Sequence, residues 1–377
     1  MAGQIIDRGP RSWLVRVYLG KVGGKRRYVS QTVRGTKRDA QQVLTKMLRD
    51  RDQGSLAAPT RTTFRAFIAE WQETSLRNRV SARTYRGYDY SLKHYILPTL
   101  GDMRLTTIQP WDIQRLYQDM LSRGLSASTV RGAHSVIRSA LKQAVRWRII
   151  ASNPADSVDL PSPKPGKHQA LTADQVRAFL EATADSPWRA LYHVLVVCGL
   201  RPGEAFGLSW ADVDLPTGRM AVRQAVTYDH ERNVVLSDPK TRGSRRSIAI
   251  PHQLVQVLSE HMTATRDIDN PLGLVFPNVD GSMIHPNHWS RRDFRRLCRI
   301  AGTPPGFRLY DLRHTCATLA LEAGVHPKIV SERLGHASTR LTLDTYSHVT
   351  PTMQDVATQQ IASIVYGGGT QPARSPN

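Results

Sequence analysis

The chain has 377 residues, long enough for two or three domains, and 52 Lys and Arg against 31 Asp and Glu give a net charge of +21. This charge favours a partner rich in phosphate, such as nucleic acid, although a merely basic surface is the alternative. Three cysteines make no disulfide framework, no secretory segment opens the chain, and no run of about 18 apolar residues predicts a membrane span. We therefore expect an intracellular, cytoplasmic protein.

The positive charge is densest in the first part of the chain. Residues 1–60 contain 13 Lys or Arg against four Asp or Glu, whereas residues 161–377 contain 24 against 19. Because the first 160 residues show no catalytic motif, we expect them to bind a partner and the remainder to catalyse.

Residues 11–33 predict a β-hairpin, because apolar residues alternate with polar ones on both sides of a glycine-rich turn at 20–24. A short strand at residues 5–6 can add a third. Thr36 then caps a helix with one apolar face, made by Ala40, Val43, Leu44, Met47 and Leu48. We expect residues 1–58 to form a small α+β module that lies against a DNA groove, with a basic structural cap as the alternative.

Residues 62–156 predict a compact bundle of helices, because four segments have apolar residues at helical spacing. Pro110 stands at a helix start and Gly124 at a helix end. We expect the aromatic residues of these segments in the core. The expected DNA contacts are basic residues away from the apolar faces: Arg83, Arg86, Lys93, Arg131, Arg138 and Lys142.

Residues 157–169 contain several prolines and predict a stiff linker. Beyond it, Thr172 and Gln175 form a capping box, and a buried helix ends at Gly199. Residues 219–226, 234–237 and 245–250 predict strands of one small sheet among helices, within a mixed, mainly helical domain at 170–366. We expect the tail, 367–377, to be disordered.

The segment 308–349 contains three short motifs. Tyr310 and Arg313 lie three residues apart at the start of a helix, so we expect them to share its polar face. A second helix starts at Pro327 and ends at Gly335, within Leu334-Gly335-His336. Tyr346 follows His336 by ten residues.

This pattern resembles the C-terminal signature of the tyrosine recombinases, or phage integrases: His-x-x-Arg, then Leu-Gly-His, then a nucleophilic tyrosine. Arg313, His336 and Tyr346 match in residue type and spacing, whereas Tyr310 stands where the family usually has its first histidine. The resemblance extends to the rest of the chain. Residues 1–58 are similar to the arm-type DNA-binding domain of integrases, and residues 62–156 to the core-binding domain.

The resemblance also implies a role for residues before this segment. Arg201 corresponds to the first catalytic arginine, and Glu204 to the acid that orients it. Lys240 corresponds to the lysine of a β-hairpin that protonates the leaving 5′ oxygen. Within the segment itself, we expect Asp311 to support the catalytic residues without reacting. Alternatively, Lys240 is a solvated loop residue, and Arg242, Arg245 and Arg246 contact DNA.

The residue types suit this chemistry. A phosphodiester under attack gathers negative charge on its nonbridging oxygens, and two arginines can clamp it from two sides. A tyrosine with a pKa of about 10 needs help to lose its proton, which His336 and the arginines can supply. Tyr310 cannot shuttle protons near neutral pH as imidazole does, so we expect a supporting role.

We expect no cofactor and no metal. His285 and His288, with Cys298 nearby, have the residue types of a zinc site but no recognised ligand spacing. A 3′-phosphotyrosine link would store the phosphodiester energy, so rejoining needs neither nucleotide nor metal.

The expected protein is thus a multidomain, mainly helical integrase that inserts or excises a mobile element or prophage. The family implies a homotetramer on two DNA attachment sites, on the nucleoid of a bacterial host, with a host DNA-bending factor and an excisionase as accessory partners. Two alternatives are a type IB topoisomerase, which relaxes DNA without site preference, and a non-catalytic DNA-binding regulator.

Overall fold

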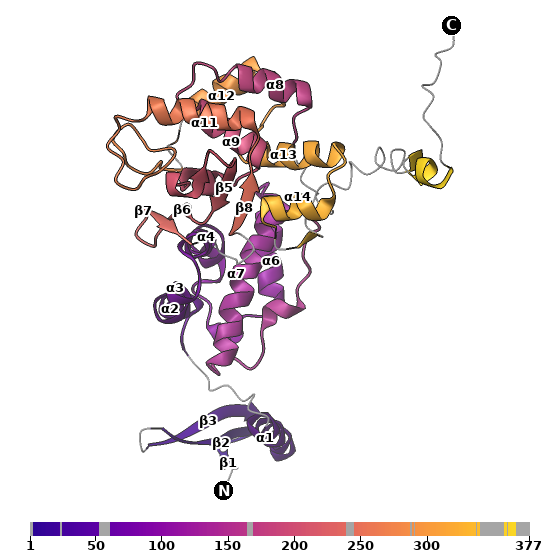
Figure 1. The fold of residues 1–377 in the computed structure, drawn as a ribbon. Coiled ribbons are helices and arrows are strands. Elements are labelled where there is room, and N and C mark those ends of the chain that lie inside the picture. Colours follow the sequence, from indigo (N-terminus) through magenta and orange to yellow (C-terminus); the bar gives the residue numbers. More distant parts are fainter. Residues whose placement is uncertain are drawn as a thin grey trace. The chain divides into compact units, whose positions relative to one another are not determined.

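A computed structural model describes residues 3–22, 25–52, 61–163, 169–238, 245–286, 289, 291–336, 338–339, 358–359 and 361–366. The chain divides into two compact units, residues 1–165 and 166–377 (Figure 1). Helices predominate and every sheet that the described residues form is small and antiparallel, which confirms the predicted fold class. No helix in this part of the chain is long and apolar enough to cross a membrane.

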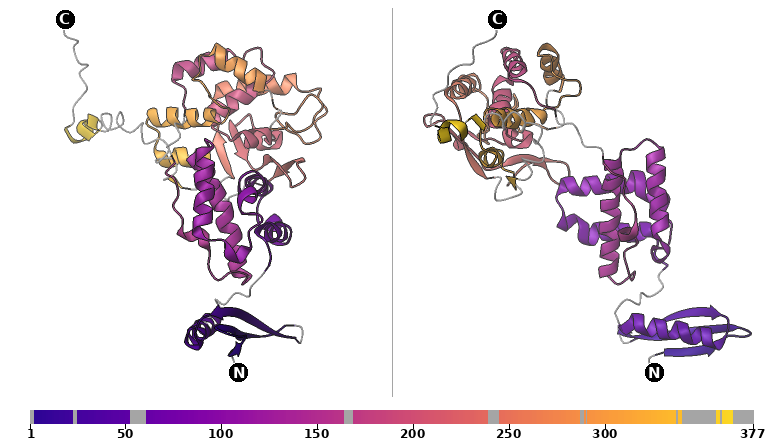
Figure 2. Two further views of the ribbon diagram at one scale, coloured as in Figure 1. Left: turned by 180° about the vertical axis from the view of Figure 1, so that it is seen from behind. Right: turned by 90° about the vertical axis from the view of Figure 1, so that its right-hand side faces the viewer.

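The first unit begins with a three-stranded sheet in the order β1-β2-β3, made by Gly3–Asp7, Ser12–Val22 and Lys25–Arg34. Helix α1, Lys37–Asp52, runs along this sheet, as the right-hand view of Figure 2 shows. The core between them is made by the inward residues of the strands and one helix face: Val15, Val17, Val29, Ala40, Leu44 and Met47. The predicted hairpin, third strand and helix are confirmed. At the helix start, the Thr36 hydroxyl accepts a hydrogen bond from the Asp39 amide at 3.3 Å.

The helices that follow are α2 (Phe64–Trp71), α3 (Arg77–Arg79), α4 (Ala82–Ser91), α5 (Leu97–Leu100), α6 (Pro110–Ser122) and α7 (Ala127–Arg146). Two π-helical turns, Gln72–Leu76 and Leu92–Ile96, and one 3-10 turn, Leu105–Thr107, lie between these helices, and a second 3-10 turn, Pro154–Ser157, follows α7. Phe64, Phe67 and Trp71 are fully buried, so the prediction that aromatic residues build this core is confirmed for these three. Val158 and Leu160 also pack on it.

The second unit is organised around the buried helix α9, Arg189–Cys198, which ends at Gly199 in the left-handed conformation (φ 63°). It contacts α8 (Ala173–Glu181), α10 (Pro202–Phe206), α11 (His252–Ala264) and α13 (Asp311–Glu322). Helix α12, Arg291–Ile300, packs on α8, and α14, Pro327–Leu334, packs on α13. The capping box of Thr172 and Gln175 is present, as predicted.

The strands of this unit form two sheets rather than the single predicted one. Strands β4 (Val213–Asp214), β5 (Arg219–Val222) and β8 (Arg246–Ala249) make one, and β6 (Ala225–Tyr228) with β7 (Val234–Ser237) makes the other. The segment predicted as one strand, 219–226, is therefore β5 and β6. Met220, Val222 and Val226 are all buried, so their alternation continues across the break. At the break, the side chain of Gln224 donates to the carbonyl of Gly207 at 2.8 Å.

Candidate active site

Arg313 lies inside the second unit, with 2% of its surface exposed. Its Nη1 donates to the carbonyl of Gly199 and its Nη2 to that of Leu334, each at 2.7 Å. The two residues predicted to share a polar face differ in burial, because Tyr310 is 40% exposed whereas Arg313 is buried on a helix that packs against α9 and α14. A guanidinium this deep in the protein needs acceptors for its N–H groups, and the two carbonyls supply them.

Three arginine side chains donate hydrogen bonds to the carbonyls at the C-terminal end of α14. The carbonyl of Arg333 accepts from Arg246 Nε at 2.6 Å, that of Leu334 accepts from Arg313, and that of Gly335 accepts from Arg201 Nη2 at 3.2 Å. The last carbonyls of a helix have no partner within it and form its negative end, so they attract cations. Gly335, with φ 66°, ends the helix in the left-handed conformation, as predicted. His336 follows directly.

Glu204 joins two of these arginines. It lies on α10 and is 4% exposed. Its Oε1 accepts from Arg201 Nη1 at 2.7 Å, and its Oε2 accepts from the Arg201 amide at 3.0 Å and from Arg246 Nη2 at 2.9 Å. Burial raises the pKa of Glu204, but the hydrogen bond and charge of Arg246, followed by those of Arg201, outweigh it and hold the pKa below its ordinary value. The carboxylate is therefore ionised and orients both arginines.

The cluster of Arg201, Arg246, Arg313 and Glu204 (the arginine cluster) has an excess of positive charge. Burial, followed by the charge of Arg201, lowers the pKa of Arg313 to about 10, so this guanidinium stays protonated at neutral pH. The side chain of Arg201 is 35% exposed, against 6% for Arg246. An anion such as a phosphate group thus meets Arg201 first, backed by the charge of Arg313.

His336 is neutral at physiological pH. Burial, then the positive charges of Arg313 and Arg201, lowers its pKa to about 4. Its backbone amide donates to the carbonyl of Ser331 at 3.0 Å, which fixes the start of the loop after α14. A neutral imidazole beside the cluster can accept a proton.

Tyr310 lies at the start of α13 and is 40% exposed. Its ring meets the ring of His314 edge to face, with 5.3 Å between centroids. His314 directly follows Arg313 but was not among the residues predicted for the site. Asp311 is 1% exposed and accepts three hydrogen bonds from Arg308, at 2.8, 3.1 and 3.0 Å. Its carboxylate therefore holds Arg308 against the first residue of α13.

Three of the expected site residues, Lys240, Arg242 and Tyr346, lie outside the described residues. The expected DNA contacts of the first unit lie on α4, on α7 and on the π-helical turn at 92–96. Arg83 and Lys142 are exposed, and Arg86 is half-buried. Lys93 pairs with Asp89 at 2.8 Å, Arg138 pairs with Asp156 at 2.6 Å, and Arg131 donates to the carbonyl of Pro161 at 3.5 Å.

The buried position of Arg246 differs from the expectation that it contacts DNA with the neighbouring Arg242 and Arg245. The signal was its register. In β8, Ile248 is buried while Ser247 and Ala249 are exposed, so Arg246 falls on the inward side of the strand. A charged residue at an inward position is uncommon and indicates a buried partner, here Glu204. Among the described residues, no group of His, Cys, Asp or Glu could hold a metal ion.

Comparison with known proteins identifies the family of the chain. Residues 169–353 match the phage integrase family, and residues 63–121 match the N-terminal SAM-like domain of phage integrases. An integrase of Streptomyces ambofaciens is 27% identical over 368 residues, which cover 92% of each chain. A XerC-like tyrosine recombinase of Caldanaerobacter subterraneus is 26% identical over 319 residues, which cover 78% of this chain and 81% of that protein.

Among solved structures, the Tn1549 transposon integrase in complex with transposon right end DNA shares the fold, with a TM-score of 0.68 at 20% identity. The match covers 78% of this chain and 98% of that chain. Together with the two matching family domains, this shows that the chain belongs to the phage integrase family of tyrosine recombinases, enzymes that cleave and rejoin DNA.

Proposed function

We propose that this protein is a site-specific integrase that inserts or excises a mobile element or prophage through a 3′-phosphotyrosine intermediate. The observation that carries the proposal is the arginine cluster held at the end of α14. We infer that Arg201, which is partly exposed, binds a nonbridging oxygen of the scissile phosphate, and that the charge of the buried Arg313 stabilises the same phosphate. Glu204 orients Arg201.

In the proposed cleavage step, the phenol oxygen of Tyr346 bonds to phosphorus while the bond from phosphorus to the 5′ oxygen breaks. The phenol proton passes to the neutral imidazole of His336, and the ammonium of Lys240 gives a proton to the 5′ oxygen. Rejoining reverses these transfers when a 5′-hydroxyl attacks the phosphotyrosine. Tyr310 assists by a hydrogen bond.

We further propose that four parts share this work: an arm-binding module (1–58), a core-binding domain (62–156), a linker (157–169) and a catalytic domain (170–366). Separate hydrophobic cores support the division of the first 160 residues.

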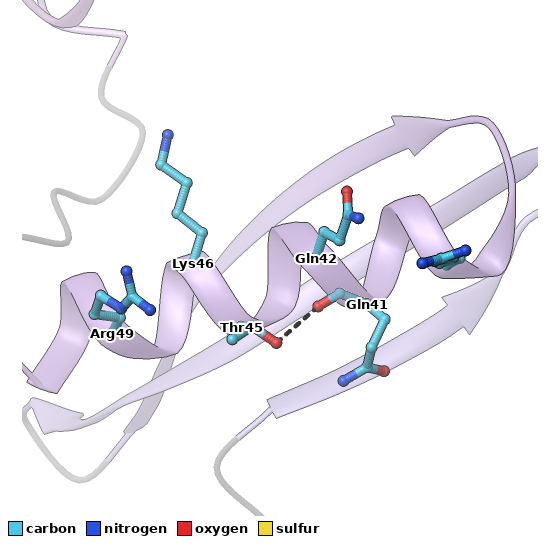
Figure 3. Close-up of a pocket in the computed structure, with 6 residues that line it drawn as sticks. Gln41, Gln42, Thr45, Lys46 and Arg49 are labelled. Carbon is cyan, nitrogen blue, oxygen red and sulfur yellow. Dashed lines mark hydrogen bonds between the residues drawn. The ribbon is translucent and has the colours of Figure 1, made fainter.

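Figure 3 shows a shallow pocket on the outer side of α1, lined by polar and basic residues: Arg38, Gln41, Gln42, Thr45, Lys46 and Arg49. On the sheet, the Arg16 guanidinium lies 4.1 Å from the centre of the Tyr28 ring. Basic surfaces of this kind suit phosphate backbones.

We also propose that the protein acts as a homotetramer on two attachment sites, assisted by a host DNA-bending factor and an excisionase. The support for self-assembly is an apolar group near the C-terminus. Four side chains there are between 60% and 83% exposed: Ile361, Ile364, Val365 and Tyr366. Such a group favours a partner surface that covers it.

A nicked duplex that carries the junction between the integrated element and the host chromosome tests the proposed chemistry. The wild-type protein should form a covalent adduct that survives a denaturing gel, and Tyr346→Phe should bind the duplex equally well but form none. An adduct in the Tyr346→Phe variant would contradict the assignment of the nucleophile. Efficient relaxation of a supercoiled plasmid without the junction would favour a topoisomerase instead.

A further inference from the structure

Arg246 links three segments that are far apart in the sequence. It lies on β8, the strand that follows residues 239–244 of the chain. Its Nη2 donates to Oε2 of Glu204 on α10 at 2.9 Å, and its Nε donates to the carbonyl of Arg333 on α14 at 2.6 Å. The side chain is 6% exposed. A buried guanidinium with these partners faces the protein, so Arg246 is not placed to contact DNA.

The two partners of Arg246 are also the supports of the proposed phosphate-binding groups. Glu204 holds Arg201 through both its side chain and its backbone amide. The carbonyl of Arg333 precedes those of Leu334 and Gly335, which hold Arg313 and Arg201. A shift of Arg246 would therefore be transmitted to both arginines.

We propose that Arg246 is a positioning residue for DNA cleavage, which holds Glu204 and the end of α14 so that Arg201 and His336 are fixed around the scissile phosphate. The inference rests on the proposed role of Arg201. The carboxylate of Glu204 accepts hydrogen bonds from both arginines, and the charge of each arginine helps to keep it ionised. Loss of one arginine should therefore weaken the hydrogen bond between Glu204 and the other. Groups that orient the residues of a site typically affect activity by about 10–100-fold when removed.

The arrangement has a consequence for pH dependence. Burial raises the pKa of Glu204, and Arg246 is the leading group that lowers it. Without Arg246, two cations remain near Glu204: Arg201, which donates a hydrogen bond to its carboxylate, and Arg313. His336 adds no positive charge, because it is neutral above about pH 4. The carboxylate should then take up a proton at a higher pH than in the wild type. A neutral Glu204 orients Arg201 less well, so cleavage should fall as the pH is lowered.

The experiment uses the full chain and the nicked junction duplex, with dissociation constants and single-turnover cleavage rates measured from pH 5.5 to 8.5. We expect Arg246→Met to bind within about twofold of the wild type and to cleave about 10–100-fold more slowly, with the larger loss at low pH. Arg246→Lys, which keeps the charge, should recover part of the rate. The matched control is Arg177→Met, an exposed arginine of α8 paired with Asp174, and it should cleave like the wild type.

A second arm removes the titrating group. In a Glu204→Gln background, Arg246→Met should cost less than it does in the wild type, and its extra pH dependence should disappear. Equal costs in both backgrounds, or an unchanged cleavage rate per bound complex in Arg246→Met, would overturn the inference. Arg201→Ala distinguishes a failure of the proposed function from a failure of this inference. If Arg201→Ala cleaves like the wild type, the proposed role of Arg201 is wrong, whatever result the Arg246 variants give.

Discussion

Replacing Arg313 by alanine should cost stability as well as catalysis. In the wild type, the carbonyls of Gly199 and Leu334 each accept a hydrogen bond from Arg313 at 2.7 Å, and the substitution removes both donors. A buried acceptor left without a donor costs about 1–3 kcal/mol, so the two together should cost about 2–6 kcal/mol. In a unit of about 200 residues, 1 kcal/mol lowers the unfolding temperature by about 2–4 °C, so we expect a fall of about 4–24 °C.

The assay is thermal unfolding followed by circular dichroism, with Arg177→Ala as the exposed control and Arg313→Lys as the variant that keeps the charge. The control should unfold with the wild type, and the lysine variant between the two. Cleavage is then compared at a temperature where every variant is folded, and Arg313→Ala should still be about a hundredfold slower, by analogy with the loss of an oxyanion donor. An Arg313→Ala transition within about 1 °C of the wild type would refute the view that these two hydrogen bonds support the fold.

Three further results are expected. Tyr310→Phe should slow single-turnover cleavage only about threefold to tenfold, because one neutral hydrogen bond contributes about 0.5–1.5 kcal/mol, and Tyr310→His should match or exceed the wild type; a loss as large as that of Arg313→Ala would make Tyr310 essential. The pKa of His336 falls from 6.5 to about 4 on folding, so between these pH values the unfolded chain binds more protons than the folded one, and the free energy of unfolding should drop as the pH is lowered. Urea unfolding of His336→Gln should therefore depend less on pH than that of the wild type, and an equal dependence would contradict this. Deletion of residues 1–58 should preserve binding at the crossover site and abolish it at separate arm sites, and identical footprints for both proteins would argue against two binding modules.

Local patterns in the sequence were sufficient for most helices and strands. The hairpin of β2 and β3, the capping box at Thr172 and the ends of α9 and α14 at Gly199 and Gly335 depend on neighbouring residues, so they could be predicted. The order of Arg201, Lys240, Arg313, His336 and Tyr346 likewise indicated the family, because the motifs around these residues are short and contiguous.

The tertiary structure decided where the charges lie. The acceptors of Arg313 are 114 and 21 residues away, and that of Arg246 on Glu204 is 42 residues away, so no local pattern reveals them. Arg313 is buried because α9 and α14 cover α13, and Arg246 is buried because β8 turns it toward α10. A buried guanidinium is stable only where acceptors from several segments meet, and that meeting point is the end of α14.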